Sequence, residues 1–314
     1  MRIAPLAALL LLAASPALAE EEDYASPDRP GIADSSGVVG KGRFQIEAGM
    51  QDDLSNTGGV HDRLISHCER RRAYRIAVLD TRQVSTVGEA RDDRAPLDST
   101  HAALYTPWII SENPLFKPGD TTRPRELALP PSGAVCGVYA RTDINRGVFK
   151  APANEVVRGA LRYDLEINFA QQETLNPIGI NCLRFFPNRG NRVWGARTIS
   201  SDPEWKYVNV RRYFNYLERS IDIGTQWAVF EPNGDKLWAN IRQAVSDFLV
   251  NEWRSGALLG TSTREAFFVR CDRSTMDQND LDNGRLICLI GVAVVKPAEF
   301  VIFRIGQKTA DARS

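Results

Sequence analysis

The sequence predicts an α/β layer followed by an α+β domain, and three observations support this fold class. Between residues 60 and 198, helical periodicity alternates with short β-branched strands, which is typical of a partly parallel sheet. From Ser200 onward, long amphipathic helices precede a group of strands, which indicates an α+β arrangement. The 314 residues are 43% hydrophobic, so the chain can bury one large or two modest cores.

The first nineteen residues have the three regions of a signal peptide. Arg2 is followed by an apolar run from Ala4 to Ala14 and by the A-x-A site Ala17-Leu18-Ala19. We therefore predict a signal peptide at 1–19, with a buried N-terminal helix as the alternative. Residues 20–53 form a polar lead, in which Phe44, Ile46 and Ala48 alternate with polar residues as in a short strand.

The α/β elements follow in order. VHDRLISHC predicts a helix with Leu64, Ile65 and Cys68 inward, and a buried strand follows at Ile76 to Leu79. A second helix and a strand in HAALYTPWI come next, and the proline-rich residues 111–132 predict an excursion from the layer.

Helical periodicity then returns with Val135, Val138 and Tyr139 on one face. RYDLEINF predicts a strand, Gln171 to Asn176 a short helix ended by Pro177, and GINCLRFF a core strand.

The C-terminal part opens with a helix that carries Val210, Phe214, Leu217 and Ile221 at helical spacing. Gly224 is placed as its C-terminal stop. QWAVFE predicts a strand, and the turn PNGD leads to a second amphipathic helix that ends near Gly256. Its apolar positions are Leu237, Ile241, Val245, Phe248 and Leu249.

Three more strands complete this part. Ser262 and Glu265 predict a capping box ahead of strand FFVRC, and RLICLIGVAVV predicts another strand. The last apolar run lies in KPAEFVIFRIGQK. A terminal strand can pair within its own domain or with the exposed edge of a neighbour. The candidate residues of this strand are Glu299, Phe300, Val301, Ile302, Phe303, Arg304 and Ile305.

Composition and motifs argue against several functions. Thirty-nine basic and thirty-nine acidic residues leave no net charge to attract nucleic acid or an anionic membrane surface. A hydrolase triad of Asp80, His101 and Ser262 can be sketched, but Ser262 is already expected to cap a helix. A metal site at His61, His67 and Cys68 lacks further ligands at standard spacing. We predict no catalytic, cofactor or metal site and no small-molecule substrate.

The cysteines do not form the framework of a secreted protein. They are odd in number, singly spaced and mostly in apolar runs, which favours small buried side chains of a cytoplasmic protein. This disagrees with the predicted signal peptide about the compartment. The five positions are Cys68, Cys136, Cys182, Cys271 and Cys288.

Several long segments resemble the tail sheath proteins of contractile phages and contractile injection systems. They include GVYARTDINRGVFKAPANEVVRGAL, LNPIGINCLRFFPNRGNRVWGARTISSDPEWKYVNVRRYFNYLERSI, GTQWAVFEPN and VKPAEFVIFRI. The resemblance implies a subtilisin-like, non-protease domain at 54–198, incomplete at its start, and a C-terminal sheath domain at 199–307 before a tail at 308–314. It also implies that Glu299 to Ile305 is either the last core strand or an arm donated to a neighbouring subunit.

The lead segment DRPGIADSSGVVGKGRFQIEAG instead resembles the start of an outer-membrane barrel transporter. We interpret the chain as a fusion near Gln51, in which the α/β sheet has lost its opening strands and has an unprotected edge. We also expect assembly to be impaired unless full-length sheath subunits are present.

The function implied by the larger resemblance is that of a structural subunit of a contractile tail sheath. Its partners would be other sheath subunits, the inner tail tube and baseplate proteins. The alternatives are an exported transporter-type fusion or non-assembling remnant, and a secreted subtilisin-like hydrolase. The sheath resemblance implies cytoplasmic assembly or a virion tail, whereas the signal peptide implies export to the periplasm.

Overall fold

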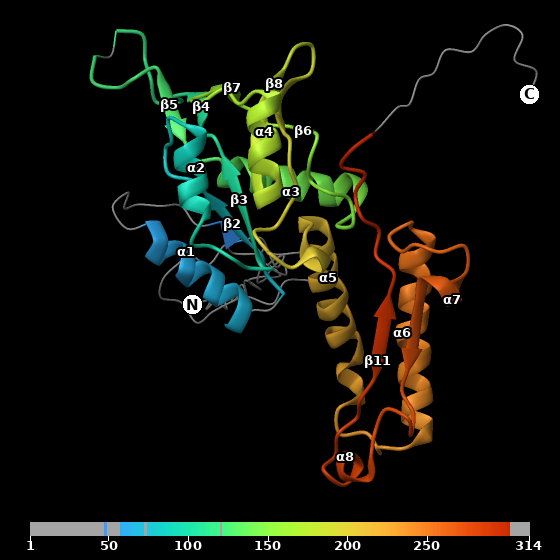
Figure 1. Cartoon of the computed structure of the whole chain (residues 1–314). Coiled ribbons are helices and arrows are strands. Elements are labelled where there is room, and N and C mark those ends of the chain that lie inside the picture. The colour runs from blue at the N-terminus through green and yellow to red at the C-terminus, as the bar shows by residue number, and fades with distance from the viewer. Residues whose placement is uncertain (1–46, 49–56, 72–73, 120, 302–314) are drawn as a thin grey trace, which may run out of the picture.

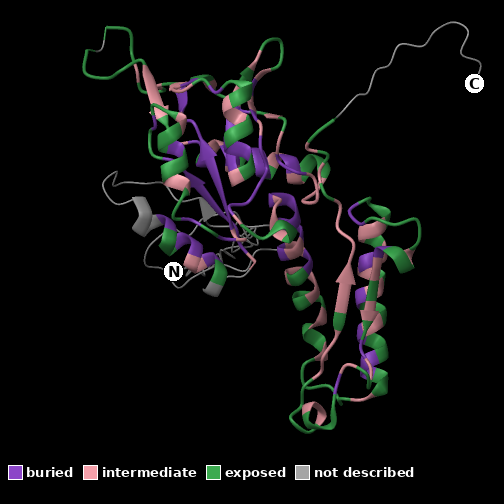
Figure 2. Ribbon diagram, in the orientation of Figure 1, coloured by how far each residue is buried: buried purple, intermediate pink, exposed green. Residues whose placement is uncertain are grey.

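The chain has two parts, a sheet flanked by helices and a pair of long helices that carry a short sheet (Figure 1). The computed structural model describes residues 47–48, 57–71, 74–119 and 121–301. Buried residues are concentrated in the first part, around its central sheet (Figure 2).

The central sheet is partly parallel, as predicted. It has the strand order β1-β2-β3-β8-β9-β6, in which β1, β2, β3 and β8 are parallel, β9 pairs antiparallel with β8, and β6 pairs antiparallel with β9. Strands β2 and β3 are buried along their whole length because helices cover both faces. The strands are β1 (Glu47–Ala48), β2 (Ala77–Asp80), β3 (Ala102–Thr106), β8 (Ile180–Phe186), β9 (Gly190–Val193) and β6 (Glu155–Val156).

Alternate residues of these strands contribute to two separate cores. Leu79 and Leu104 pack with the residues of one face, to which α1, α2 and α4 contribute. Val78 and Tyr105 pack on the other face, which is covered by α3. The helices are α1 (Thr57–Ser66), followed by a π-helical turn (His67–Arg71), α2 (Val87–Arg94), α3 (Ser132–Arg146) and α4 (Phe169–Leu175).

Of two strand predictions in this part, one needs correction. The strand predicted in HAALYTPWI is present as β3, and after a cis Thr106-Pro107 bond the chain continues into β4 (Ile109–Glu112). RYDLEINF is a strand only at its start, in β7 (Ala160–Tyr163), because Asn168 serves as the N-cap of α4. The proline-rich excursion contains β5 (Glu126–Leu129), and these strands form a second sheet in the order β5-β4-β7.

The sequence analysis expects an unprotected edge of the α/β sheet, and this expectation is wrong at β2. The short strand of the polar lead is present as β1, and it pairs in parallel with β2 through Glu47↔Ala77 and Ala48↔Val78. A segment placed outside the α/β domain by the sequence analysis therefore covers part of the edge of β2.

The two long helices of the second part are α5 (Val208–Thr225) and α6 (Asp235–Arg254). The predicted stop at Gly224 is wrong, because α5 continues through Gly224 and ends at Thr225. The Thr225 hydroxyl donates a hydrogen bond to the Ile221 carbonyl oxygen. QWAVFE is also not a strand: Gln226–Ala228 is a 3₁₀ turn, and no strand lies beside it in the described chain. Helix α6 ends as predicted, since Gly256 has a φ of 84°.

The remaining elements are short. Ser262 is the N-cap of α7 (Thr263–Ala266) but makes no side-chain capping bond, so the predicted capping box is wrong. The Glu265 carboxylate instead accepts hydrogen bonds from the backbone and hydroxyl of Thr261, at 2.8 and 2.9 Å. Strands β10 (Phe267–Arg270) and β11 (Leu289–Val292) form an antiparallel pair, with α8 (Gln278–Asp282) between them.

Candidate functional site

Glu299 anchors the start of the last predicted strand to the first part of the molecule. Its carboxylate accepts two hydrogen bonds from the Arg197 guanidinium, at 2.8 and 2.7 Å. Asn176 and Tyr207 donate two more, at 2.7 and 3.1 Å, and Lys206 lies 3.9 Å away. We call Glu299 and these four partners the Glu299 clamp.

The partners of Glu299 are held by the fold around them. Asn176 follows α4 directly, while Arg197 comes from the chain after β9 and pairs with Tyr207 in an isolated bridge. The Asn181 side chain on β8 accepts from the Arg197 backbone N–H and donates to its carbonyl oxygen, both at 2.7 Å. Arg197 also donates to the Asn176 carbonyl oxygen at 3.0 Å. Contacts other than those with Glu299 therefore also hold Arg197 in place.

The electrostatics keep Glu299 ionised. Burial raises the pKa of its carboxyl group, but the hydrogen bonds from Arg197, Asn176 and Tyr207 outweigh burial and hold the pKa below its usual value. Arg197 and Glu299 are both largely buried, at 8% and 17% side-chain exposure. Removal of one partner would leave a poorly solvated charge, which is costly.

The two described residues that follow Glu299 are exposed. Phe300 and Val301 are each 69% exposed, and no residue from Val295 to Val301 belongs to a strand. Of the two expectations, a last core strand within the same domain is not formed by the described residues. Ile302, Phe303, Arg304 and Ile305 lie outside the described residues.

The pair β10 and β11 has free strand edges in the part of the chain that the structure describes. Its register runs from Phe267↔Val292 to Arg270↔Leu289, and no third strand lies beside it there. One face packs on the core that includes α6. The ring of the exposed Phe268 on β10 covers Gly291 on β11, since a Cβ added to Gly291 would lie 2.2 Å from that ring. The open edges are where another strand could add.

The residues of the sketched triad are not brought together. Asp80 accepts a hydrogen bond from the backbone N–H of Ser132, and His101 contacts its neighbour Thr100. Ser262 precedes α7 in the second part of the molecule, away from β2 (Figure 1). His61 and Cys68 are buried, and within the described ranges no group of three His, Cys, Asp or Glu side chains could hold a metal ion.

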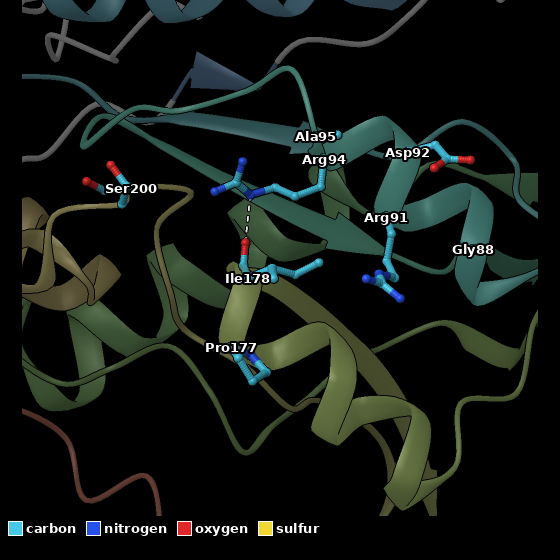
Figure 3. Close-up of a pocket in the computed structure, with 9 residues that line it drawn as sticks. Gly88, Arg91, Asp92, Arg94, Ala95, Pro177, Ile178 and Ser200 are labelled. Carbon is cyan, nitrogen blue, oxygen red and sulfur yellow. Dashed lines mark hydrogen bonds between the residues drawn. The ribbon is translucent and has the colours of Figure 1, made fainter.

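A hollow of about 590 Å³ lies between α2 and the turn after α4 (Figure 3). Its most prominent charge, Arg94, donates hydrogen bonds to the carbonyl oxygens of Ile178 and Ile199, both at 2.7 Å, and to that of Leu97. These bonds tie α2 to two loops, so the guanidinium has a structural role. Among the helices that the structure describes, none is long and apolar enough to cross a membrane.

Sequence reasoning named Glu299 only as the first residue of a predicted strand and did not find its partners. Arg197, Asn176 and Tyr207 come from three separate places in the chain, and none stands in a recognisable motif. Only the fold brings them together.

Comparison with known proteins gives a consistent result. Residues 51–199 match the model of the phage tail sheath protein central domain, and residues 200–308 match that of the phage tail sheath C-terminal domain. The tail sheath protein of Vibrio phage KVP40 is 24% identical over 231 residues, which is 72% of this chain and 32% of that protein. The chain spans less than two thirds of the length of the curated relatives it matches.

Solved structures of contractile injection systems are also similar. A chain of the anti-feeding prophage baseplate aligns with 34% identity and a TM-score of 0.73, covering 86% of this chain and 70% of that one. A chain of the anti-feeding prophage helical sheath in the contracted state aligns with 34% identity and a TM-score of 0.72, covering 85% and 71%.

Proposed function

Since the chain belongs to the phage tail sheath family, we propose that it is a structural subunit of a contractile phage-type sheath. In this role it polymerises around an inner tube and contracts to drive injection. Its partners are other sheath subunits, the inner tail tube and baseplate proteins. The observation that carries the proposal is the likeness of both parts of the chain to a helical sheath, at 34% identity over 85% of its length.

The segment Glu299 to Ile305 is the proposed contact between subunits. A strand that is to join a neighbour must leave its own domain from a fixed point and must not be consumed by a local sheet. The Glu299 clamp supplies the fixed point, and the exposure of Phe300 and Val301 is consistent with departure from the surface. The acceptor we propose is an open edge of β10 and β11 on a neighbouring copy.

The division of the chain follows from the same proposal. We assign residues 54–198 to a subtilisin-like domain without protease activity and residues 199–307 to the C-terminal sheath domain. The parallel strands with helices on both faces support the first assignment, as does the use of Asp80 in a buried structural contact. The signal peptide at 1–19 and the barrel-like lead remain predictions.

Electron microscopy tests this function directly. The chain without residues 1–19 is purified and imaged alone, and again after mixing with an intact sheath protein that polymerises by itself. We expect rings or tubes that contain the chain in the mixture and impaired assembly without the partner, as inferred from the fusion. Monomers or amorphous aggregate in both samples contradict the function. Well-formed tubes from the chain alone contradict only the inferred impairment.

A further inference from the structure

Two cysteines lie side by side at the open end of the β10 and β11 pair. The last register pair of these strands is Arg270↔Leu289, and one further step along the antiparallel ladder places Cys271 opposite Cys288. Both cysteines are free, and their thiols are in hydrogen-bonding contact. Cys271 and Cys288 flank the segment 272–287, which carries α8, and we call the point where they meet its neck.

We propose that Cys271 and Cys288 are a disulfide-forming pair that closes this segment covalently under oxidising conditions. Opposed residues of antiparallel strands have Cα atoms about 4.5 to 5.5 Å apart. That separation lies within the range of about 4.4 to 6.8 Å that disulfides require. The backbone spacing expected at this pair is therefore compatible with a disulfide bond. This inference does not depend on the proposed function.

The closed segment is held at present by apolar side chains in the core of the second part, Met276 among them, and by several hydrogen bonds. The Thr275 hydroxyl donates to the Ile287 carbonyl oxygen at 2.8 Å, and Asn233 donates to the Arg285 carbonyl oxygen at 3.0 Å. The Arg242 guanidinium donates to the Cys271 carbonyl oxygen. The segment lies at the end of the second part that is farthest from the central sheet (Figure 1). A covalent bond at its neck would hold α8 in place when these weaker contacts open.

The exchange can be written with a small disulfide, oxidised glutathione, as the oxidant. Cys288, which is partly exposed, loses its proton and attacks one glutathione sulfur, which forms a mixed disulfide and releases one glutathione thiolate. Cys271 then loses its proton and attacks the Cys288 sulfur, which forms the internal bond and releases the second thiolate. The protein loses two protons and two electrons, and oxidised glutathione becomes two molecules of reduced glutathione.

The environment of the thiols predicts the rate. Burial raises the pKa of Cys288 to about 11, and Cys271 adds to this effect. Burial also raises the pKa of Cys271, although the hydrogen bond with Cys288 works in the opposite direction. Because the thiolate is the reactive species, the exchange should be slow at pH 7 and should accelerate about tenfold per pH unit up to pH 9.

The pair also bears on the conflict over compartment. An exported chain enters an oxidising environment, in which such a pair closes, whereas a cytoplasmic chain is kept reduced. The two cysteines would thus stay as free thiols in one compartment and form a cross-link in the other.

The test uses the full chain, incubated with oxidised glutathione between pH 7 and 9. Free thiols are then alkylated, and the peptides are mapped without reduction. We expect one internal Cys271–Cys288 bond, alkylated Cys68, Cys136 and Cys182, and slower trypsin cleavage at Arg273 and Arg285. Cross-linking should also raise the melting temperature by about 5 °C.

Two variants sharpen the result. Cys271→Ser should retain glutathione on Cys288 because no second thiol resolves it, whereas the control Cys136→Ser should cross-link like the unaltered chain. Three outcomes in the unaltered chain overturn the proposal: glutathione retained on Cys288, a bond between two copies, or both thiols unreacted at pH 9. Because these three outcomes are measured on the unaltered chain, they test the proposal even if a variant fails to fold.

Discussion

At the scale of single residues, Asp80 shows how a strand-end carboxylate can look catalytic and yet be structural. One carboxylate oxygen accepts from the Ser132 backbone N–H at 2.6 Å, and the other has no hydrogen-bond partner among the described residues. Burial raises the pKa of Asp80 to about 7 against the opposing effect of the Ser132 hydrogen bonds. The folded state therefore binds a proton more tightly than the unfolded chain does.

This linkage gives a pH-dependent prediction. Between the unfolded pKa of about 3.9 and the folded pKa of about 7, the native state holds the extra proton, so its stability falls as the pH rises. Asp80→Asn should be nearly neutral in unfolding free energy at pH 4 and stabilising by about 2 to 4 kcal/mol at pH 8. Urea unfolding at both pH values measures this. An equal effect at both pH values contradicts the assignment.

Arg212 presents the opposite case, a charge whose partner makes its burial possible. Its side chain is fully buried, and it donates to the Asp143 carboxylate at 3.0 and 2.5 Å. The guanidinium also lies 4.5 Å from the ring centre of Tyr139. Through these contacts α5 of the second part is joined to α3 of the first.

Loss of this charge should therefore be costly. Arg212→Met leaves Asp143 without its cation and should lower the unfolding free energy by about 3 to 5 kcal/mol. The double variant Arg212→Met, Asp143→Leu should recover much of that loss because no uncompensated charge remains. The control Arg219→Met removes an exposed ion pair and should change stability by less than about 1 kcal/mol. A double variant as unstable as the single one contradicts this explanation.

At the scale of elements, Gly179 links α4 to β8 in a place that tolerates no side chain. Its φ is 82°, and an added Cβ would lie 2.4 Å from the backbone oxygen of Thr198. Gly179→Ala should cost about 2 to 4 kcal/mol, because both the left-handed backbone and the backbone contact oppose it. Gly190 has a similar φ of 73° but open space around its Cβ position, so Gly190→Ala should cost only about 1 kcal/mol. Equal losses in chemical unfolding would exclude the contact with Thr198 as the cause.

The elements also show which information the sequence carries. Strand β3 and helix α6 were predictable because their apolar spacing is set by burial within the domain. QWAVFE has the composition of a strand, but its Val229 and Phe230 are exposed, and pairing with a partner strand is not encoded locally. Gly224 failed as a stop because a glycine ends a helix only where the backbone turns left-handed, and α5 does not turn there.

The same limit applies to the candidate site. The β-branched and aromatic residues from Phe300 to Ile305 predict a strand, and this stays a prediction because Ile302 to Ile305 lie outside the described residues. The anchoring of this segment could not be predicted, because the Glu299 clamp includes Asn176, Arg197 and Tyr207, which lie 92 to 123 residues from Glu299 in the sequence. Patterns in a single sequence report the local spacing of residues and do not identify contacts between residues so far apart in the chain.

At the scale of the whole molecule, the clamp connects the proposed arm to a body that is itself tightly joined. Glu299 belongs to the second part but is bound by residues of the first, and Arg212 and Asn209 add further bonds across the same boundary. Asn209 donates to the carbonyl oxygens of both Phe149 and Val295, at 2.9 and 3.3 Å. A pull on the proposed arm would thus be transmitted to both parts of the molecule.

The arm and its clamp can be separated by truncation. Deletion of 302–314 leaves the Glu299 clamp and the three cores intact, so the melting temperature should change little, whereas incorporation into a sheath should be lost because no strand remains to pair. Deletion of 308–314 removes only the tail and is the matched control. Glu299→Gln keeps the strand but weakens its anchor, so it should incorporate less than the full chain and more than the 302–314 deletion. Co-sedimentation with intact sheath protein measures all three. Equal incorporation of the 302–314 deletion and the control would mean that subunits join through another surface.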